Sequence, residues 1–398
     1  MNLKMIGGIL MILGTSIGAG MLALPVASAS AGFVSSAVLL ISCWLGMTIG
    51  AFLILEVILW LPEDTNLISM VKLTLGKSGQ AVAWLCYLML LYTLLCAYIS
   101  GNSDVLQNIL QACHLMVPRW ASTILVVILL GSIVYRGVCS VDIVNRGLMT
   151  GKILIYLLLV LAIAPHIHAT QLIIHHSKIT IVTVMVMITS FGFAIIVPSL
   201  RTYFNSNVRQ LKKVILIGSL VPLLFYIIWV AIVQGVLPVA VLKQLAVSTH
   251  TTTGLAKHLA VTVNSAWMGS FVHIFISICA LTSFLGVSLC LFDFLADGLQ
   301  LKKRGVNGML VSAITFLPPM LIIILVPGAF IHALSYAGIF VIIILMLFPA
   351  IMAWSGRYWK KIEVGEYRLW GGKPLLIIEI LASIALIGWN VVHLLIAI

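Results

Sequence analysis

The fold is decided by the stretch Gly14-Thr15-Ser16-Ile17-Gly18-Ala19-Gly20-Met21-Leu22-Ala23-Leu24-Pro25. This stretch lies inside an apolar run of membrane-spanning length, yet it is a poor continuous helix. Glycine costs about 1 kcal/mol per helical position relative to alanine, so we expect the run to unwind near its middle, with Gly18 in a backbone conformation that a branched residue such as valine cannot readily adopt. Backbone groups freed there need polar partners that lipid does not offer, and a bound solute is one source of them.

A second stretch has the same construction. It reads Thr189-Ser190-Phe191-Gly192-Phe193-Ala194-Ile195-Ile196-Val197-Pro198, and like the first it contains Thr-Ser-x-Gly followed by a proline. For either stretch alone, small residues that let helices pack closely are a sufficient explanation. Two matched stretches in spans one and six, an odd number of spans apart, instead favour an inverted repeat of five plus five helices with a site at the two breaks.

Composition places the chain in a membrane. Hydrophobic residues make up 62% of the 398 residues and charged residues only 8%, whereas soluble domains carry roughly a quarter charged residues. The net charge of +12 comes from small basic groups between apolar runs, which is typical of membrane orientation and not of nucleic-acid binding. The seven cysteines show no paired motif, so we expect no disulfide framework.

The chain is therefore predicted to be an all-α polytopic membrane protein with about eleven transmembrane helices. We interpret residues 1–398 as a single transmembrane transporter domain, with repeat one at about 5–165, repeat two at about 179–354 and an extra helix at about 373–397. The connection 236–264 is expected to form short surface helices. Apolar runs long enough to cross the bilayer fall at roughly 5–30, 33–60, 80–110, 119–136, 146–165, 179–203, 209–235, 265–298, 307–326, 329–354 and 373–397.

The basic residues predict the orientation of these spans. With the first loop outside, every one of the 22 basic residues lies on the cytoplasmic side except Arg119, Lys178, Lys243 and Lys257. Such a bias is typical of the positive-inside rule. We therefore expect a multi-pass protein of the bacterial inner (cytoplasmic) membrane with its N-terminus in the cytoplasm and its C-terminus in the periplasm.

The first break has the chemistry to hold a zwitterion. The amides of Gly18, Ala19 and Gly20 begin the second half-helix, where the helix dipole favours a carboxylate. Carbonyls that end the first half-helix, and those near Ser190, are suited to an ammonium group. The predicted backbone site is made of Thr15, Ile17, Gly18, Ala19, Gly20, Ser190, Phe191 and Gly192.

Seven stretches of the chain carry a resemblance to a known family: residues 14–25, Leu55-Glu56-Val57, Tyr98-Ile99-Ser100-Gly101, residues 189–193, residues 282–287, residues 291–297 and Ala313-Ile314-Thr315-Phe316-Leu317-Pro318-Pro319. They resemble the hydroxy/aromatic amino acid permease family, and within it the bacterial tyrosine permeases. The resemblance covers essentially the whole chain. It implies a LeuT-like inverted repeat with discontinuous helices 1 and 6, and proton-coupled uptake of tyrosine, tryptophan or, in a sister branch, serine and threonine. Ala194 departs from the pattern, which has a histidine there.

Two ionisable residues inside spans are candidates for moving the proton, which is the only coupling ion we expect; no other cofactor is predicted. A charged residue near the membrane centre is costly. Lys152 in span five either snorkels to the interface or, as the resemblance implies, lies between spans one and eight where sodium-coupled relatives hold sodium. Glu56 at the inner end of span two either relays protons or forms an interfacial ion pair or cap.

The solute's side chain should lie among residues of spans three, six, eight and ten. An aromatic ring gains about 0.5 to 1.5 kcal/mol per ring pair beyond burial, so we expect aromatic amino acids to be preferred. The hydroxyl of tyrosine would need Asn102, Thr282 or Ser283 as a buried partner. The predicted side-chain pocket consists of Tyr98, Asn102, Phe191, Phe193, Thr282, Ser283, Phe284 and Tyr336.

The expected function is a proton-coupled symporter that imports aromatic amino acids, with tyrosine favoured. Transport of another neutral amino acid (tryptophan, serine or threonine) is the alternative. A channel would need a continuous polar stripe and a membrane enzyme a reactive cluster, so neither is favoured and we expect no enzyme activity. The histidines of His166-x-His168 and His175-His176 lack carboxylates, so no metal site is predicted. The expected partners are the amino acid and the lipid bilayer, with no nucleic acid and no obligate protein partner.

Overall fold

The computed structural model describes residues 3–61, 65–173, 178–248, 251–263, 266–362 and 367–397. All regular secondary structure in these ranges is helical. Nine of the described helices are long and apolar enough to cross a membrane, and a bent pair forms a tenth crossing. The predicted fourth span is present as a shorter apolar helix, α5 (Arg119–Tyr135).

Most spans are single helices close to the predicted bounds. They are α3 (Phe33–Leu59), α4 (Leu67–Ala112), α5, α6 (Val138–Ile163), α10 (Val208–Val236), α13 (Ala266–Gly298), α14 (Gly305–Leu325) and α17 (Gly372–Ala397). The predicted surface helices of the 236–264 connection are α11 (Val239–Val247) and α12 (Thr251–Thr262), and a further short pair is η1 (Ala164–His166) and α7 (Ala169–Ile173).

Three spans are composite. The first is α1 (Leu3–Ser16) followed by α2 (Ala19–Ala27), and the sixth is α8 (Ile181–Ser190), the 3₁₀-helix η2 (Gly192–Ile196) and α9 (Val197–Tyr203). The tenth combines α15 (Phe330–Ile342), the π-helix η3 (Ile343–Leu347), α16 (Phe348–Trp354) and the π-helix η4 (Ser355–Trp359). The two breaks therefore lie in spans one and six, as predicted.

The third span begins earlier than the predicted residue 80. Asn66 caps α4 by accepting a 2.8 Å hydrogen bond from the Ser69 amide, and helical structure continues to Gly76, where φ is 85°. That left-handed conformation favours glycine and kinks the chain. The short helical segment before Gly76 was missed because its polar residues do not resemble a span.

The first break is a bend of 54° between α1 and α2. Gly18 lies at this bend with φ −147° and ψ −153°, an extended conformation open to any residue. The expected backbone reason for Gly18 is therefore wrong. The actual reason is a close approach, because a Cβ atom on Gly18 would lie 2.2 Å from the Ser283 Oγ.

At the second break the chain remains helical, but the α-helix tightens into a 3₁₀-helix. Phe191 ends α8 with φ −99° and ψ 27°, and the chain then continues as 3₁₀-helix for five residues. Pro198 lies in the first turn of α9, where proline's missing N–H leaves no bond unmade. The carbonyls at the end of α8 are thus released from regular helical bonding beside the first break.

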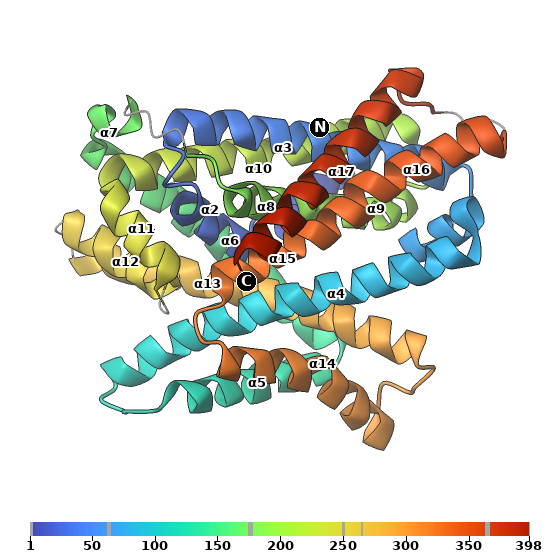
Figure 1. The fold of residues 1–398 in the computed structure, drawn as a ribbon. Helices are drawn as coiled ribbons and strands as arrows, with labels where there is room; N and C mark the ends of the chain where they lie inside the picture. Colours follow the sequence, from blue (N-terminus) through green and yellow to red (C-terminus); the bar gives the residue numbers. More distant parts are fainter. Residues whose placement is uncertain are drawn as a thin grey trace.

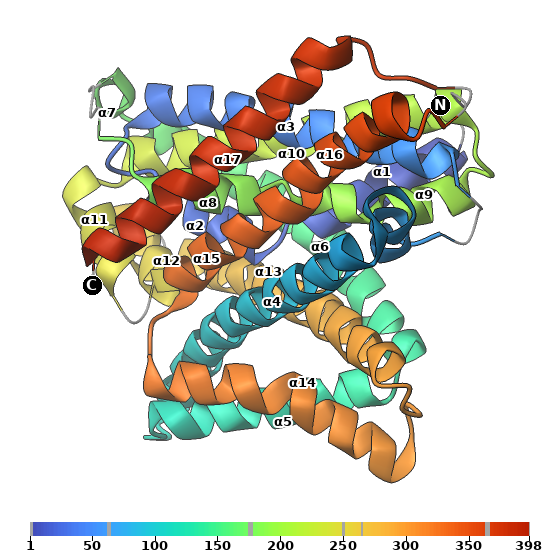
Figure 2. The ribbon, with the colours of Figure 1, turned by 45° about the vertical axis from the view of Figure 1, so that its right-hand side comes forward.

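The breaks lie at the centre of the bundle. In both views α5 and α14 lie side by side at one edge, α11 and α12 lie at another, and α17 crosses the outside of α15 and α16 (Figures 1 and 2). Glycines allow close packing around the tenth span: a Cβ on Gly338 would meet the Met185 carbonyl oxygen at 2.7 Å, and one on Gly50 the Leu345 carbonyl oxygen at 2.0 Å.

Candidate functional site

Lys152 joins span five to the first break and to span eight. Its side chain is 1% exposed. The Nζ atom donates to the carbonyl oxygen of Ile17 and, at 3.2 Å, to the hydroxyl oxygen of Thr282. The position between spans one and eight that the resemblance implied for Lys152 is therefore present, and snorkelling to the interface is not what the side chain does.

The Ser283 side chain accepts a hydrogen bond from one of the amides that we expected to bind a carboxylate. The Ala19 amide donates a 2.8 Å hydrogen bond to the Ser283 Oγ, which satisfies the first free donor of α2. In the described chain, the amides of Gly18 and Gly20 have no acceptor from backbone or side chain. Two donors at a positive helix end thus stay available beside the Ser283 hydroxyl.

The two breaks are bridged by a residue that the sequence reasoning missed. Tyr226 of α10 lies with its hydroxyl oxygen 2.5 Å from the Ser16 carbonyl oxygen and 2.8 Å from that of Ser190. Its side chain is fully buried. A tyrosine in the middle of an otherwise apolar span was the only available signal, because a buried phenol usually has a hydrogen-bond partner.

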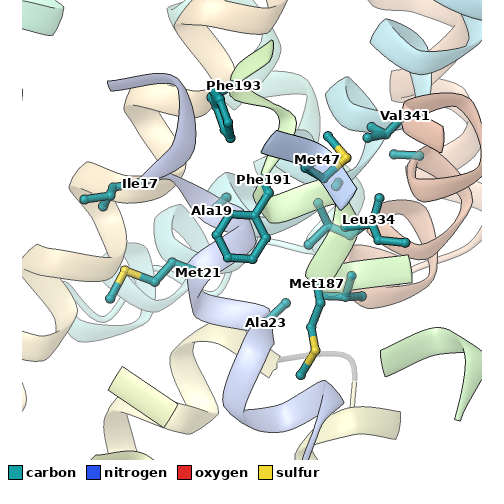
Figure 3. Packing of buried hydrophobic residues seen from close by; sticks show 14 of the residues in the cluster. Ile17, Ala19, Met21, Ala23, Met47, Met187, Phe191, Phe193, Leu334 and Val341 are labelled. Atoms are coloured by element: carbon teal, nitrogen blue, oxygen red, sulfur yellow. The ribbon is translucent and has the colours of Figure 1, made fainter. Parts of the chain in front are cut away.

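Phe191 and Phe193 are both fully buried at the second break. The Phe191 ring packs edge-on against Tyr226, with the ring centroids 5.1 Å apart. Figure 3 shows Phe191 beside Ala19 of α2, with Phe193 on the same segment further from α2. A Cβ on Gly192, between them, would meet nothing within 4 Å, so there is open space at this turn.

Other predicted pocket residues differ in their placement. Tyr98 interacts with the Ser283 hydroxyl, which brings span three to the break. Asn102 donates to the carbonyl oxygens of Tyr98 at 2.8 Å and Ala280 at 3.0 Å, so its amide nitrogen ties α4 to α13. It also lines a groove of about 220 Å³ between α4, α5 and α13.

Three further residues lie away from the break. Phe284 stacks on Phe316 of α14, with centroids 5.9 Å apart. Tyr336 lies on the exposed face of α15 and is 41% exposed. Thr15 is exposed on α1, where its hydroxyl donates to the Ile12 carbonyl at 2.9 Å. None of these three side chains contacts the groups at the break through a described interaction.

An accessible stripe runs along α13 from the break to the end of the helix. It consists of Ser283, Gly286, Cys290, Asp293 and Asp297, which recur every three or four residues and are all partly or fully exposed. The polar members Ser283, Asp293 and Asp297 favour water over lipid. By contrast, α2 is buried from its first residue through Val26.

Glu56 lies in a different cluster from Lys152. Arg357 donates to both of its carboxylate oxygens, from Nε to Oε1 at 2.7 Å and from Nη2 to Oε2 at 2.5 Å. The Leu369 amide donates to Oε2 at 2.7 Å. Because Glu56 and Arg357 are both almost fully buried, this arrangement is typical of a structural ion pair.

The described residues contain no group of three or more histidine, cysteine or acidic side chains that could hold a metal ion. Of the histidines considered for a metal site, His175 and His176 lie outside the described residues. The expectation that the chain has no metal site stays a prediction.

Comparison with known proteins identifies the family. Residues 1–390 match the model of the tryptophan/tyrosine permease family. The tyrosine-specific transport system 1 of Haemophilus influenzae is 31% identical over 384 residues, covering 96% of this chain and 95% of that protein. The tryptophan-specific transport protein of the same organism is 30% identical over 411 residues, covering 97% of each chain.

The fold is shared with a more distant solved structure. The crystal structure of the Eremococcus coleocola manganese transporter in complex with an aromatic bis-isothiourea substituted compound superposes with a TM-score of 0.64 at 11% identity, covering 98% of this chain and 85% of that one. The predicted LeuT-like fold class is confirmed. Because the sequence relatives are transport proteins and not enzymes, this chain is a multi-pass membrane transporter that belongs to the tryptophan/tyrosine permease family.

Proposed function

We propose that the chain is a proton-coupled symporter that imports aromatic amino acids, with tyrosine favoured, by alternating access. The observation that carries the proposal is the double contact of the Lys152 ammonium group with Ile17 at the first break and Thr282 of span eight. It places an ionisable group in direct contact with the backbone that would bind the solute.

The backbone supplies both ends of a zwitterion's binding site. The carboxylate accepts from the amides of Gly18 and Gly20 and from the Ser283 hydroxyl, at the positive end of α2. The ammonium group donates to the carbonyl oxygens of Ser16 and Ser190, which both lie within hydrogen-bond distance of the Tyr226 hydroxyl. Both charged ends of the solute are thereby paired inside a site that excludes lipid.

Proton coupling follows from the cost of a buried charge. The Lys152 ammonium is supported by its two acceptors, and a buried cation without acceptors is strongly unfavourable. Movement of α1 away from Lys152 removes the Ile17 carbonyl, so the lysine then releases its proton to the accessible side. The conformational change and the proton are linked through a single hydrogen bond.

Aromatic specificity rests on the ring of Phe191, which packs against Tyr226 beside the space at Gly192, and on Tyr98, which interacts with the Ser283 hydroxyl. Relatives specific for tyrosine and for tryptophan are nearly equally similar to this chain, so tryptophan is the second candidate. Ala194, which is fully buried in η2, stands where the resemblance implies a histidine, so this position takes up less volume than in that pattern.

The remaining assignments rest on charge and span count. The inner membrane, a cytoplasmic N-terminus and a periplasmic C-terminus follow from the basic residues. Repeat one at 5–165, repeat two at 179–354 and the extra helix form one transport domain, and the accessible stripe of α13 then opens to the cytoplasm. The proton is the only coupling ion in this proposal.

The test is uptake into proteoliposomes under an inward proton gradient, with all twenty amino acids as competitors of radiolabelled L-tyrosine. A symporter gives saturable uptake that collapses with a protonophore. Stronger competition by leucine or serine than by tyrosine rejects the aromatic assignment and leaves transport intact, whereas unsaturated flux rejects a symporter in favour of a channel.

A further inference from the structure

Tyr226 has one proton for two acceptors. A phenol donates a single hydrogen bond, yet its oxygen lies within hydrogen-bond distance of the carbonyl oxygens of both Ser16 and Ser190. One of these two contacts is therefore unsatisfied at any moment, in a fully buried setting where an unmade hydrogen bond is costly.

An ammonium group is a better donor for this pair of carbonyls. It carries three protons in a tetrahedral arrangement and a positive charge, and hydrogen bonds from charged groups are roughly twice as strong as neutral ones. It would satisfy both carbonyls at once. The phenol oxygen therefore lies where the amine of the proposed solute belongs, and both cannot hold that position.

The surroundings of Tyr226 connect it to the second break. Its ring meets Phe191 edge-on, and α10 packs along both α1 and α2. A shift of the phenol that clears the two carbonyls changes this ring contact with Phe191, which lies at the turn between α8 and η2. Arrival of an amine is thus transmitted to the aromatic residue beside the side-chain pocket.

We propose that the Tyr226 hydroxyl is a resident substitute for the solute's ammonium group, which it yields when an amino acid binds. This inference rests on the proposed function for the existence of an amino acid substrate, but it does not depend on which amino acid is bound. Tyr226 is a positioning residue that tunes affinity for the amine and ties α1 to α8 between binding events.

The experiment compares two probes and two variants by equilibrium binding to purified full-length protein. L-tyrosine has the amine, and 3-(4-hydroxyphenyl)propionate lacks it. Tyr226→Phe keeps the ring against Phe191 and removes only the competing hydroxyl. Tyr92→Phe is the matched control, because Tyr92 also donates from a tyrosine hydroxyl to a backbone carbonyl, that of Ile314 at 2.7 Å, but between α4 and α14.

We expect Tyr226→Phe to bind L-tyrosine roughly two- to tenfold more tightly, the equivalent of one net hydrogen bond, with no change for the propionate. Tyr92→Phe should change neither. An unchanged or weaker affinity of Tyr226→Phe for L-tyrosine would overturn the inference, because the hydroxyl would then be a structural link or a direct ligand.

The proposed function and this inference fail in different ways. If the wild-type protein binds tryptophan in place of tyrosine, the same comparison is made with L-tryptophan and 3-(indol-3-yl)propionate, and the expected ratio is unchanged. If the wild-type protein binds no amino acid, both proposals are rejected. If the wild type binds and transports tyrosine, but the ratio of the affinities for L-tyrosine and for the propionate is the same in Tyr226→Phe as in the wild type, only this inference is rejected.

Discussion

The Ser283 hydroxyl accepts a 2.8 Å hydrogen bond from the backbone amide of Ala19, a residue 264 positions earlier in the chain. This one contact fixes the start of α2 against span eight. It also leaves no room for a side chain on Gly18, whose Cβ would lie 2.2 Å from the Ser283 Oγ but 3.5 Å from its Cβ. The steric conflict therefore involves a single oxygen atom.

Gly18→Ala should destabilise the protein by about 1 to 3 kcal/mol through overpacking, and Ser283→Ala in the same chain should restore stability because it removes that oxygen. Thermal unfolding of the purified single and double variants measures both effects. A double variant no more stable than Gly18→Ala alone would show that the defect lies in the backbone.

Lys152→Ala should abolish accumulation of L-tyrosine driven by a pH gradient while exchange of labelled for unlabelled substrate across the membrane persists. The reason is that only net transport needs the proton, whereas exchange needs the solute site alone. Lys243→Ala, on the exposed face of α11, is the control and should behave as wild type. Normal gradient-driven uptake by Lys152→Ala would reject Lys152 as the coupling group.

Glu56→Gln should lower stability without altering the pH dependence of uptake. Removing one partner of a buried ion pair costs about 3 to 5 kcal/mol because the other charge stays buried. The double variant Glu56→Gln with Arg357→Gln should lose less stability than the two single losses added together. A shifted pH profile in Glu56→Gln would instead support the alternative, that this carboxyl relays protons.

Phe191→Ala should weaken uptake of aromatic amino acids far more than it lowers protein level in the membrane. Phe284→Ala is the matched control, because its ring is equally buried but lies against Phe316 of α14. That variant should lose stability, by about 3 to 5 kcal/mol, and keep its substrate preference. The two variants are compared by uptake normalised to protein level; equal loss of aromatic preference in both would reject Phe191 as part of the pocket.

Cys290 should react with a membrane-impermeant maleimide from the open end of the stripe on α13, whereas the buried Cys43 should not. A saturating aromatic amino acid should slow the reaction of Cys290, because the stripe ends at the proposed binding site. Labelling is measured by the mass added to the peptide that carries each cysteine. Absence of label on Cys290 would show that the stripe is closed to water.

The sequence could predict the parts of the site that depend on local composition. The glycines and prolines of the two matched stretches locate both breaks. For Lys152 the composition left snorkelling open, and only the family resemblance implied its place between spans one and eight. The place of Tyr226 was not predictable, because the carbonyls it contacts belong to residues 210 and 36 positions away.

Phe284 shows a second limit. Consecutive residues on an α-helix point about 100° apart, so a helix that turns Ser283 toward the break turns Phe284 toward α14. The sequence alone does not show which face of such a mostly apolar span points toward the break and which points toward α14. The same ambiguity applies to Tyr336, which shares a helix with buried neighbours but faces outward.

The bend between α1 and α2 has a consequence for energetics. In span one, the atoms that would bind the solute, namely the amides of Gly18 and Gly20 and the carbonyl of Ser16, lie at this bend, beside the Ile17 carbonyl that accepts from Lys152. Thermodynamic linkage is reciprocal, so any ligand that stiffens this bend has an affinity that depends on the bend angle. In the proposed transport cycle, binding of the solute and reorientation of α1 against α2 would therefore act on the same few backbone atoms.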